Sequence, residues 1–506
     1  MGRSRSQQQN VQEPESEKDI KVSKNYQENV DFLKQELGVG ASFDVIFTEI
    51  LVGGKKIAIF GLNGMVDGEV LSQIMAVLEL AQRENMVPNT LEKVFQGRIA
   101  TNQVTKVSTM DKVIFFVLSG PVALVVEGAE EIIIVDIRSY PGRMPEEPDI
   151  ERVTRGSRDG FVETLVFNVA LIRRRLRDPK LRMEIMQAGS RSKTDVCVAY
   201  IEDVANRDLV DVIKKEIQAI KIDGIPMAEK SVEEFILGKK YWNPFPKVRY
   251  TERPDVAAIH LLEGHVLVMV DTSPSVMITP STLFHHMQHA EEYRQNPAVG
   301  VYIRWIRFLA IFLSVFLVPA WFVLASDPGY LPGWLKFVGL SKVTKIPLGW
   351  QLLTGEIGID IVRMAAIHTP TPLATALGII AAFMLGDVAI KAGLFAPEVI
   401  MYLAFSAVGT FATPSYELSV ANRLARIFMI LAVWFFNVWG FVAGTVLILL
   451  LLGFTKSFGV PYLWPLVPFN WQALRSILVR SPVPIHNIRP SILKPQDPTR
   501  QPEGRN

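Results

Sequence analysis

Four long runs without a charged residue lie in the C-terminal part of the chain, and they constrain its fold more than any other feature. The runs are Phe308–Ala325, Leu373–Gly386, Val399–Thr413 and Ile427–Thr455. The first has 18 residues and the last has 29, and about 20 apolar residues cross a hydrocarbon layer about 30 Å thick as an α-helix. The sequence therefore predicts an α-helical, multi-span membrane domain over residues 303–455, with about four spans.

The composition excludes several other classes of protein. The 506 residues are 49% hydrophobic and carry a formal net charge of +2. This balance gives no reason to expect nucleic-acid binding, which usually requires a strongly basic face. Cys197 is the only cysteine, so an internal disulfide is excluded. The polar N-terminus lacks the apolar core of a secretory signal, so we expect the soluble part to stay in the cytoplasm.

The N-terminal half has a mixed pattern that repeats. Residues 1–41 are mostly polar and predict a disordered tail. Alternating strand patterns and helical spacings then follow over 42–138, and the same order of patterns returns over 190–285. We therefore predict a two-lobed, soluble α/β domain made of a duplicated subdomain, with a helical connector at 139–189.

Single positions support the duplication. When the two copies are aligned, Gly120 meets Gly264, and Asp67 meets Asn206 at the start of a predicted helix. A side-chain oxygen at such a position can accept hydrogen bonds from free backbone N–H groups. We interpret Asp67 and Asn206 as helix N-caps and not as ligand-binding residues.

A basic cluster of Arg173, Arg174 and Arg175 lies near the end of a predicted helix in the connector. Cations at a helix C-terminus are favoured by the helix dipole, which explains a solvated cluster. The alternative is a contact with lipid phosphates or with the acidic surface of a neighbouring subunit.

Cationic residues also flank the membrane domain. Arg304 and Arg307 follow the lead-in at 286–302 and precede the first span, and the tail at 456–506 contains Lys456, Arg475, Arg480 and Arg489. The positive-inside tendency therefore places both flanks in the cytoplasm. With four spans, Arg423 and Arg426 would lie outside the membrane.

A charged stripe lies between the first two predicted spans. Glu356, Asp360 and Arg363 have the spacing i, i+4, i+7 on a helix predicted over 348–366, whose other residues, including Val362, are mostly apolar. Charges at bilayer depth are costly unless they are paired or hydrated. Two interpretations remain open, namely an interfacial helix with ion pairs within it and a helix that lines a pore or its vestibule.

Two further pairs fall in the same domain. Asp387 and Lys391, again four residues apart, either line the same path or form an ion pair at a helix end. Gly440 and Gly444 form a GxxxG pair in the last run, which permits close packing of helices.

Motifs for catalysis are absent from the sequence. It contains no Walker loop, HExxH motif, nucleophile elbow or CxxC pair, so we expect neither an enzyme nor a cofactor. His285 and His289 are one helical turn apart in HHMQH, but no third ligand is evident nearby, so no metal site is predicted.

Several strings between about residues 42 and 468 resemble the spore germination receptor A-subunit family. They include RGSRDGFVETLVFNVALIRRRL, FPKVRYTERPDVAAIHLLEGHVLVMVD and ATPSYELSVANRLARI. The resemblance implies an integral protein of the inner spore membrane with a cytoplasmic N-terminal domain. It also implies a homo-oligomer that forms an ion channel during germination, with other spore membrane germination proteins and membrane lipid as partners.

By the same resemblance, the stripe Glu356, Asp360 and Arg363 and the following segment 370–390 belong to the conduction path. A role in ion release, and with it in dipicolinate release, is therefore expected. Two alternatives are a scaffold or accessory subunit of the dipicolinate transport apparatus and a secondary transporter. A transporter would predict an inverted repeat in the membrane domain, and the sequence contains none that we can identify.

Overall fold

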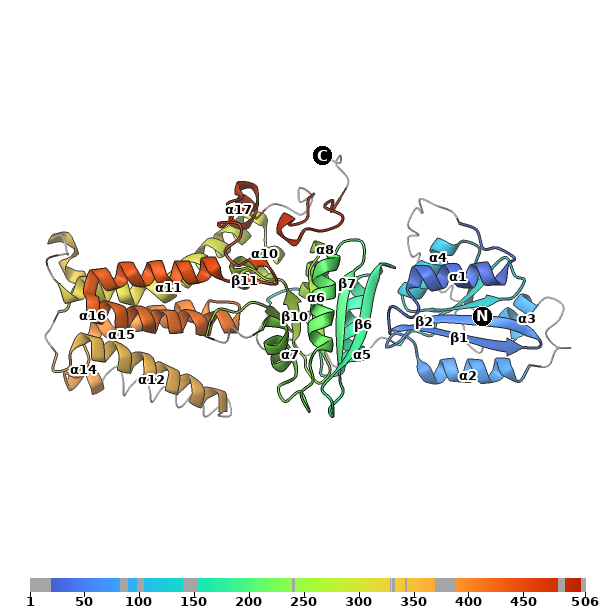
Figure 1. Ribbon diagram of the computed structural model, residues 1–506, viewed down its shortest axis with the longest axis horizontal. Helices are drawn as coiled ribbons and strands as arrows, with labels where there is room; N and C mark the ends of the chain where they lie inside the picture. The colour runs from blue at the N-terminus through green and yellow to red at the C-terminus, as the bar shows by residue number, and fades with distance from the viewer. Residues whose placement is uncertain are drawn as a thin grey trace, which may run out of the picture. The chain divides into compact units, whose positions relative to one another are not determined.

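Two five-stranded sheets with their helices and a bundle of long helices make up the described chain in the computed structural model (Figure 1). The structure describes residues 20–81, 90–97, 104–139, 151, 153–238, 242–327, 329, 333–341, 344–368, 388–480 and 487–501. The chain divides into two compact units. One unit holds residues 1–144, 162–186 and 197–203, and the other holds 145–161, 187–196 and 204–506.

The first lobe is an antiparallel sheet with helices on both faces. Its strand order is β1-β2-β4-β5-β3. The strands are β1 (Val45–Val52), β2 (Lys55–Leu62), β3 (Val104–Val107), β4 (Val122–Val126) and β5 (Ile132–Val135). The helices are α1 (Tyr26–Leu37), α2 (Gly68–Glu79), α3 (Thr90–Gly97) and α4 (Met110–Leu118).

Alternation along the strands builds the two cores of this lobe. Ala58 and Phe60 of β2 pack against α1 and α4, whereas Ile57 and Ile59 pack on the opposite face with α2 and α3. Successive side chains of a strand point to opposite faces. Because helices cover both faces, β2 is apolar at nearly every position and not only at alternate ones.

The second lobe repeats this topology strand for strand. Its sheet has the order β6-β7-β9-β10-β8, with β10 antiparallel to both β8 and β9. The strands are β6 (Leu181–Ala188), β7 (Thr194–Ile201), β8 (Arg249–Thr251), β9 (Val266–Val270) and β10 (Val276–Thr279). The helices are α5 (Leu165–Arg175), α6 (Arg207–Gln218), α7 (Ala228–Leu237) and α8 (Pro254–Glu263). The two lobes therefore have the same order of elements and of strands, as the predicted duplication requires.

The repeats begin earlier than the sequence pattern predicts. Helix α1 lies within the predicted tail, and α5 and β6 lie within the predicted connector. Helix α1 is polar overall, but Val30, Leu33 and Leu37 form one buried side. A narrow apolar stripe is enough to dock a helix on a sheet, and composition alone does not reveal it.

Two details repeat at single residues. The side chain of Asp67 accepts from the N–H groups of Glu69 and Val70, and that of Asn206 accepts from the N–H of Asp208. The N-cap interpretation is therefore correct for both. Gly120 and Gly264 have φ of 110° and 100°, a backbone conformation that favours glycine.

A buried asparagine bridge also occurs once in each lobe. Asn29 accepts from the N–H of Ser23 at 2.9 Å and donates to its carbonyl at 2.6 Å. Asn168 makes the same two bonds with Val162, at 2.8 and 2.6 Å. Both asparagines are six residues after their partner and fix the chain that leads into the first helix of the repeat.

Four long helices of the bundle lie within the described residues. They are α11 (Pro297–Ser326), α12 (Leu348–His368), α15 (Pro397–Phe411) and α16 (Tyr416–Phe454). Short elements accompany them: α9 (Leu283–Met287), α10 (Ala290–Arg294), η3 (Gly333–Val338), α14 (Ala389–Lys391), β11 (Lys456–Ser457), β12 (Val460–Pro461), α17 (Trp471–Leu478) and η6 (Ser491–Leu493).

Side-chain contacts set the directions of these helices. Trp321 of α11 stacks on Tyr402 of α15 with ring centroids 4.6 Å apart, and Ser406 donates to the carbonyl of Ser314 at 2.9 Å. Helices α11 and α15 are therefore antiparallel. The N–H of Ala396 donates to Gln351 at 2.8 Å, so α12 and α15 begin at the same end of the bundle. Helix α12 runs along the bundle and does not lie across its end.

Helix α16 consists of two helices that fold back on each other at Asn437. The backbone of Asn437 has φ 49° and ψ −129°, which is not helical. A Cβ on Gly440 would lie 1.9 Å from the carbonyl oxygen of Ala432. In a straight helix eight residues span about 12 Å, so this proximity requires a reversal. The prediction of a single span over Ile427–Thr455 is therefore wrong.

By length and composition alone, α11 and the undivided segment Tyr416–Phe454 of α16 are sufficient to cross a membrane, while the apolar helix α15 is shorter. The predicted span Leu373–Gly386 lies outside the described residues. The segment after α16 returns to the second lobe, where Ser457 accepts from the N–H of Ser281 at 3.1 Å and donates to the carbonyl of Lys247. The start of α11 and the segment that follows α16 thus lie at the same end of the bundle.

Candidate functional site in the helical bundle

The centre of the bundle contains a buried ion pair between Glu356 of α12 and Arg426 of α16. Nε of Arg426 lies 2.6 Å from Oε1 of Glu356, and Nη2 lies 2.7 Å from Oε2. Each side chain is 1% exposed. This two-point geometry is the strongest form of an arginine–carboxylate interaction. Each charge is compensated by the other within the apolar surroundings.

The remaining donor of Arg426 is also satisfied. Its Nη1 donates to the carbonyl of Ser314 on α11, to Oγ of Ser406 at 2.8 Å and to Oγ1 of Thr410 at 3.3 Å, both on α15. One guanidinium therefore ties all four long helices together. A buried charge is tolerated when it is paired and its hydrogen bonds are complete.

A second ion pair lies one turn further along α12. Asp360 pairs with Arg423 of α16, and their side chains are 30% and 10% exposed. The guanidinium of Arg363 then lies over the ring of Tyr416, 4.8 Å from its centroid. This stacking is a cation–π interaction. The whole predicted stripe faces α16, so its partners are on a neighbouring helix.

The structure contradicts the intrahelical ion pairs of one of the two open interpretations, and it contradicts the outer position of Arg423 and Arg426 that followed from four spans. The described contacts of Glu356 and Asp360 contain no ion pair with Arg363 of the same helix. Arg423 and Arg426 are not outside the bundle, because they are the partners of the stripe. The sequence contains a signal for this pairing. Glu356 and Asp360 are one helical turn apart, as are Arg423 and Arg426. On two antiparallel helices each acid can therefore face one arginine.

A cavity of about 360 Å³ adjoins the end of the stripe. Arg307, Arg363 and His289 supply its basic groups, and Thr410 and Ser419 supply hydroxyls. Because Thr410 also binds Arg426, a continuous series of polar groups leads from this cavity to the buried ion pair.

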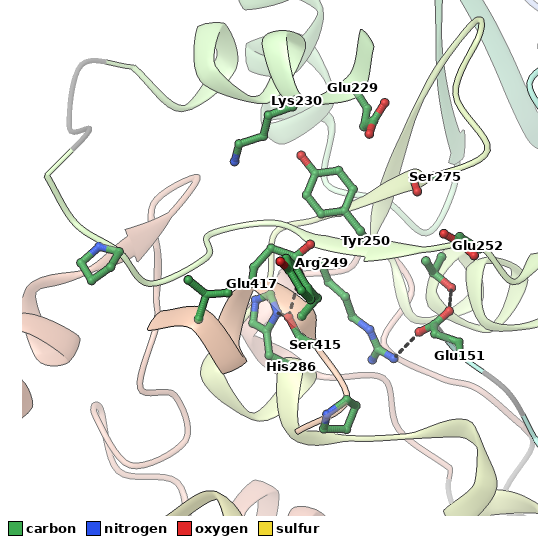
Figure 2. Close-up of a pocket in the computed structure, with 15 residues that line it drawn as sticks. Glu151, Glu229, Lys230, Arg249, Tyr250, Glu252, Ser275, His286, Ser415 and Glu417 are labelled. Atoms are coloured by element: carbon green, nitrogen blue, oxygen red, sulfur yellow. Dashed lines mark hydrogen bonds and ion pairs between the residues drawn. The ribbon is translucent and has the colours of Figure 1, made fainter. Parts of the chain in front are cut away.

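A second pocket of about 420 Å³ lies between β8 and the turn that joins α15 to α16. Figure 2 shows Glu229 and Lys230 on one side of it and His286 and Ser415 on the other. Its charged lining residues are Glu151, Glu229, Glu252, Glu417, Lys230 and Arg249. Carboxylates outnumber cations in this lining, so the pocket favours cations over anions.

Internal contacts hold the walls of this pocket. Glu151 accepts from Thr251 at 2.5 Å and pairs with Arg249 at 3.5 Å, as Figure 2 shows. The hydroxyl of Tyr250 donates to Glu233 at 2.6 Å. Burial, together with the charge of Glu233, raises the pKa of Tyr250. The phenol therefore stays protonated and remains a donor at neutral pH.

The other candidate residues of the membrane domain occupy several environments. Val362 is partly exposed on α12, and Lys391 is exposed at the end of α14. Asp387 lies outside the described residues. Gly440 and Gly444 lie on the second part of α16, against Ala432 and Met429 of the first part.

The basic cluster of α5 is divided between interior and surface. Arg173 is 1% exposed and binds Asp44 through Nε at 2.7 Å and Nη2 at 3.2 Å. Arg173 therefore forms a buried ion pair that joins α5 to the residue just before β1. Neither the solvated helix end nor the lipid or subunit contact is correct for Arg173. Arg174 is exposed, and Arg175 donates to the carbonyl of Leu171 at 2.8 Å.

A duplicated α/β domain followed by a helical bundle with buried ion pairs defines a membrane protein with a large soluble part. The chain belongs to the Bacillus/Clostridium GerA spore germination protein family, whose pattern matches residues 31–492. It is thus a germination receptor A-subunit-like membrane protein. Its membership agrees with the resemblance inferred from the sequence.

Individual relatives extend over almost the whole chain. Stage V sporulation protein AF of Bacillus subtilis (strain 168) is 50% identical over 486 residues, which cover 96% of this chain and 98% of the relative. Spore germination protein KA of the same organism is 29% identical, with 96% of this chain and 90% of the relative covered. The polar N-terminus and the HHMQHAEEYRQNP segment also indicate similarity to the first of these proteins.

Part of the chain is similar to a solved structure. That structure is the N-terminal domain of the A subunit of the Bacillus megaterium spore germinant receptor GerK3, with 27% identity and a TM-score of 0.40. The match covers 51% of this chain and 95% of that domain.

Proposed function

We propose that the protein is a subunit of an oligomeric ion channel in the inner spore membrane, and that it acts in ion release during germination. The observation that carries this proposal is the series of polar groups inside the apolar bundle. It begins at the cavity beside Arg363 and continues through the pair of Asp360 and Arg423 to the pair of Glu356 and Arg426. Charged groups within membrane helices usually mark ion pathways or proton relays.

The exposure of the stripe suggests which residue is nearest to the path. Glu356 is closed inside the subunit, whereas the side chain of Asp360 is 30% exposed. We infer that Asp360 contributes to the electrostatic potential of the path and that Glu356 holds the helices in place. In an oligomer one such carboxylate is repeated in every copy, so small electrostatic effects add up around the ring.

Self-association is supported by the apolar outer faces of the bundle. Ile357, Ile361 and Met364 of α12 are each more than half exposed, and so are Phe435 and Trp439 of α16. Such faces are stable only against lipid or against another copy of the chain. We propose that membrane lipid and other copies share them, with the soluble lobes on the cytoplasmic side. Other germination proteins of the spore membrane are the remaining proposed partners.

A scaffold or accessory role for dipicolinate transport is the alternative, and one observation favours it. The ion pairs of the stripe are formed within one chain, and Arg426 alone joins four helices. An arrangement of this kind also serves a protein whose membrane part is only structural.

A charge exchange at Asp360 and Arg423 separates the two functions. Three strains would be compared: wild type, Asp360→Asn, and the double variant Asp360→Arg with Arg423→Asp. The double variant restores an ion pair with the opposite orientation. Potassium release from germinating spores would be measured together with the amount of protein in the spore membrane.

The channel proposal expects the double variant to regain normal protein levels but not the normal rate of potassium release, because the carboxylate has moved. Asp360→Asn should also change this rate at normal protein levels. The scaffold alternative expects the exchange to restore both quantities. Wild-type potassium release in both variants, at normal protein amounts, would overturn the channel proposal. Val362→Ala serves as an apolar comparison on the same helix.

A further inference from the structure

Three side chains with metal-binding atoms meet at the junction of α8 and β9. His260 and Glu263 lie on the last turn of α8, and His265 follows after Gly264 in the sequence HLLEGH. One ligand atom from each of the three side chains can be chosen so that all lie within 4.8 Å of one another. The left-handed conformation of Gly264, with φ 100°, reverses the chain and brings His265 back beside the helix end.

His265 is the least satisfied polar side chain of this group. It is 0% exposed, and neither of its ring nitrogens has a hydrogen-bond partner among the described residues. The carbonyls of Pro280 and Thr279 lie near the ring but outside hydrogen-bond geometry. A neutral imidazole whose nitrogens lack such partners offers a lone pair to a cation.

His260 is oriented for the same purpose. Its Nδ1 lies 2.8 Å from the carbonyl oxygen of Val256, so this nitrogen carries the proton and Nε2 keeps its lone pair. A hydrogen bond from one ring nitrogen to a backbone carbonyl is the usual support of a metal-binding histidine.

Glu263 supplies a negative charge to the group. Arg500 pairs with Oε1 of Glu263 at 3.6 Å, which leaves the other carboxylate oxygen for a second cation. The positive charge of Arg249 acts on the histidines and disfavours a cation beside them. Direct coordination of a divalent ion by three ligands outweighs this repulsion.

His285 lies close to the group but differs from its members. Its ring centroid is 5.0 Å from that of His265. Its Nδ1 accepts from the backbone N–H of Thr282 at 3.1 Å, so in the neutral ring Nε2 carries the proton. In this tautomer Nε2 has no lone pair for a metal. His285 therefore packs beside the group without completing it.

We propose that His260, Glu263 and His265 bind one divalent transition-metal ion, with zinc as the best-fitting ion. Two imidazoles and one carboxylate favour zinc over calcium or magnesium, which prefer oxygen ligands. Tetrahedral zinc places its ligand atoms about 3.3–3.5 Å apart, so small side-chain rotations from the present separations are sufficient. Water would complete the coordination.

The site is separate from the proposed ion path and would stabilise the second lobe. Arg489 donates to the carbonyl of Leu262 at 2.8 Å, and Arg500 pairs with Glu263. The metal would thus fix the turn on which the C-terminal segment docks. This role does not depend on the channel proposal.

Zinc binding to the full-length protein tests the site. The protein would be purified with a tag that contains no histidine and reconstituted in lipid nanodiscs. It would then be equilibrated with ZnCl₂ and analysed for metal per chain, and cobalt absorption would report the ligand geometry. The variants are His265→Gln, Glu263→Gln and His285→Gln, with His289→Gln as a control outside the group.

We expect one zinc ion per wild-type chain and a rise in melting temperature with zinc. His265→Gln and Glu263→Gln should weaken binding roughly 10- to 100-fold or more, while His289→Gln and His285→Gln should keep it. Melting without zinc shows whether each variant is folded. Absence of zinc binding to the wild-type protein would overturn the proposal whatever the variants do. Equal binding and equal cobalt spectra in wild type and His265→Gln would also overturn it.

Discussion

Arg426 and Glu356 form a two-point ion pair across α16 and α12, and each side chain is 1% exposed. Removal of one partner leaves a buried charge without its counterion, which costs about 3–5 kcal/mol. Arg426→Met and Glu356→Met should therefore each strongly reduce the amount of folded protein in the spore membrane. Immunoblots of membrane fractions and thermal unfolding in detergent would measure this loss.

The double variant with methionine at both positions provides the control. Replacing a buried ion pair by apolar side chains of similar volume is often neutral or stabilising. We expect the double variant to be more abundant than either single variant. If the loss of folded protein in the double variant equals the sum of the losses in the two single variants, the two residues are not coupled.

The ion pair of Arg173 and Asp44 predicts a contrast between two neighbouring arginines. Arg173→Ala leaves the 1% exposed Asp44 without its partner and should destabilise the compact unit that holds both residues by about 3–5 kcal/mol. Arg174→Ala changes an exposed side chain and should alter stability by less than about 0.5 kcal/mol. Thermal unfolding and limited proteolysis of the full chain would compare them. Equal effects of the two substitutions would contradict the buried position of Arg173.

The asparagine bridges predict equivalent effects in the two lobes. Asn29 and Asn168 are 2% and 0% exposed, and each binds both backbone groups of the residue six positions before it. Substitution of either by alanine removes two hydrogen bonds from partly buried backbone groups and should cost about 1–3 kcal/mol. Proteolysis near the start of α1 should increase in Asn29→Ala, and near the start of α5 in Asn168→Ala. An effect in only one lobe would mean that the bridge has lost its role in the other.

The fold of the soluble half could be predicted because its signals are local. Strand alternation, glycines at turns and polar residues at helix starts each involve a few neighbouring residues, and the same order occurs twice. The starts of the repeats were harder to predict. The buried side of α1 is formed by a few apolar residues among polar ones, so the average composition of the segment does not reveal it.

The site in the bundle could be predicted only in part. The stripe itself follows from helical spacing, but its partners Arg423 and Arg426 are more than 60 residues away and depend on how the helices pack. The break at Asn437 has neither proline nor glycine at its centre, so the apolar run looks uniform. The group around His265 lies within six consecutive residues, HLLEGH, but the sequence alone shows neither the left-handed turn at Gly264 nor the burial of both histidines.

The reversal at Asn437 makes the most specific prediction about the membrane domain. A Cβ on Gly440 would lie 1.9 Å from the carbonyl oxygen of Ala432 and 2.4 Å from its carbon. Both atoms are backbone and cannot move aside without separating the two parts of α16. Gly440→Ala should therefore prevent normal folding, and little mature protein should reach the membrane.

Two other glycines of α16 provide graded controls. A Cβ on Gly444 would lie 2.6 Å from the sulfur of Met429, a flexible side chain that can shift, so Gly444→Ala should have a smaller effect. A Cβ on Gly453 would meet no atom within 4 Å, so Gly453→Ala should leave the protein level unchanged. Quantitative immunoblots of the three strains would give this order. If α16 were one straight helix, residues 432 and 440 would lie about 12 Å apart along its axis, and Gly440→Ala would then be as harmless as Gly453→Ala.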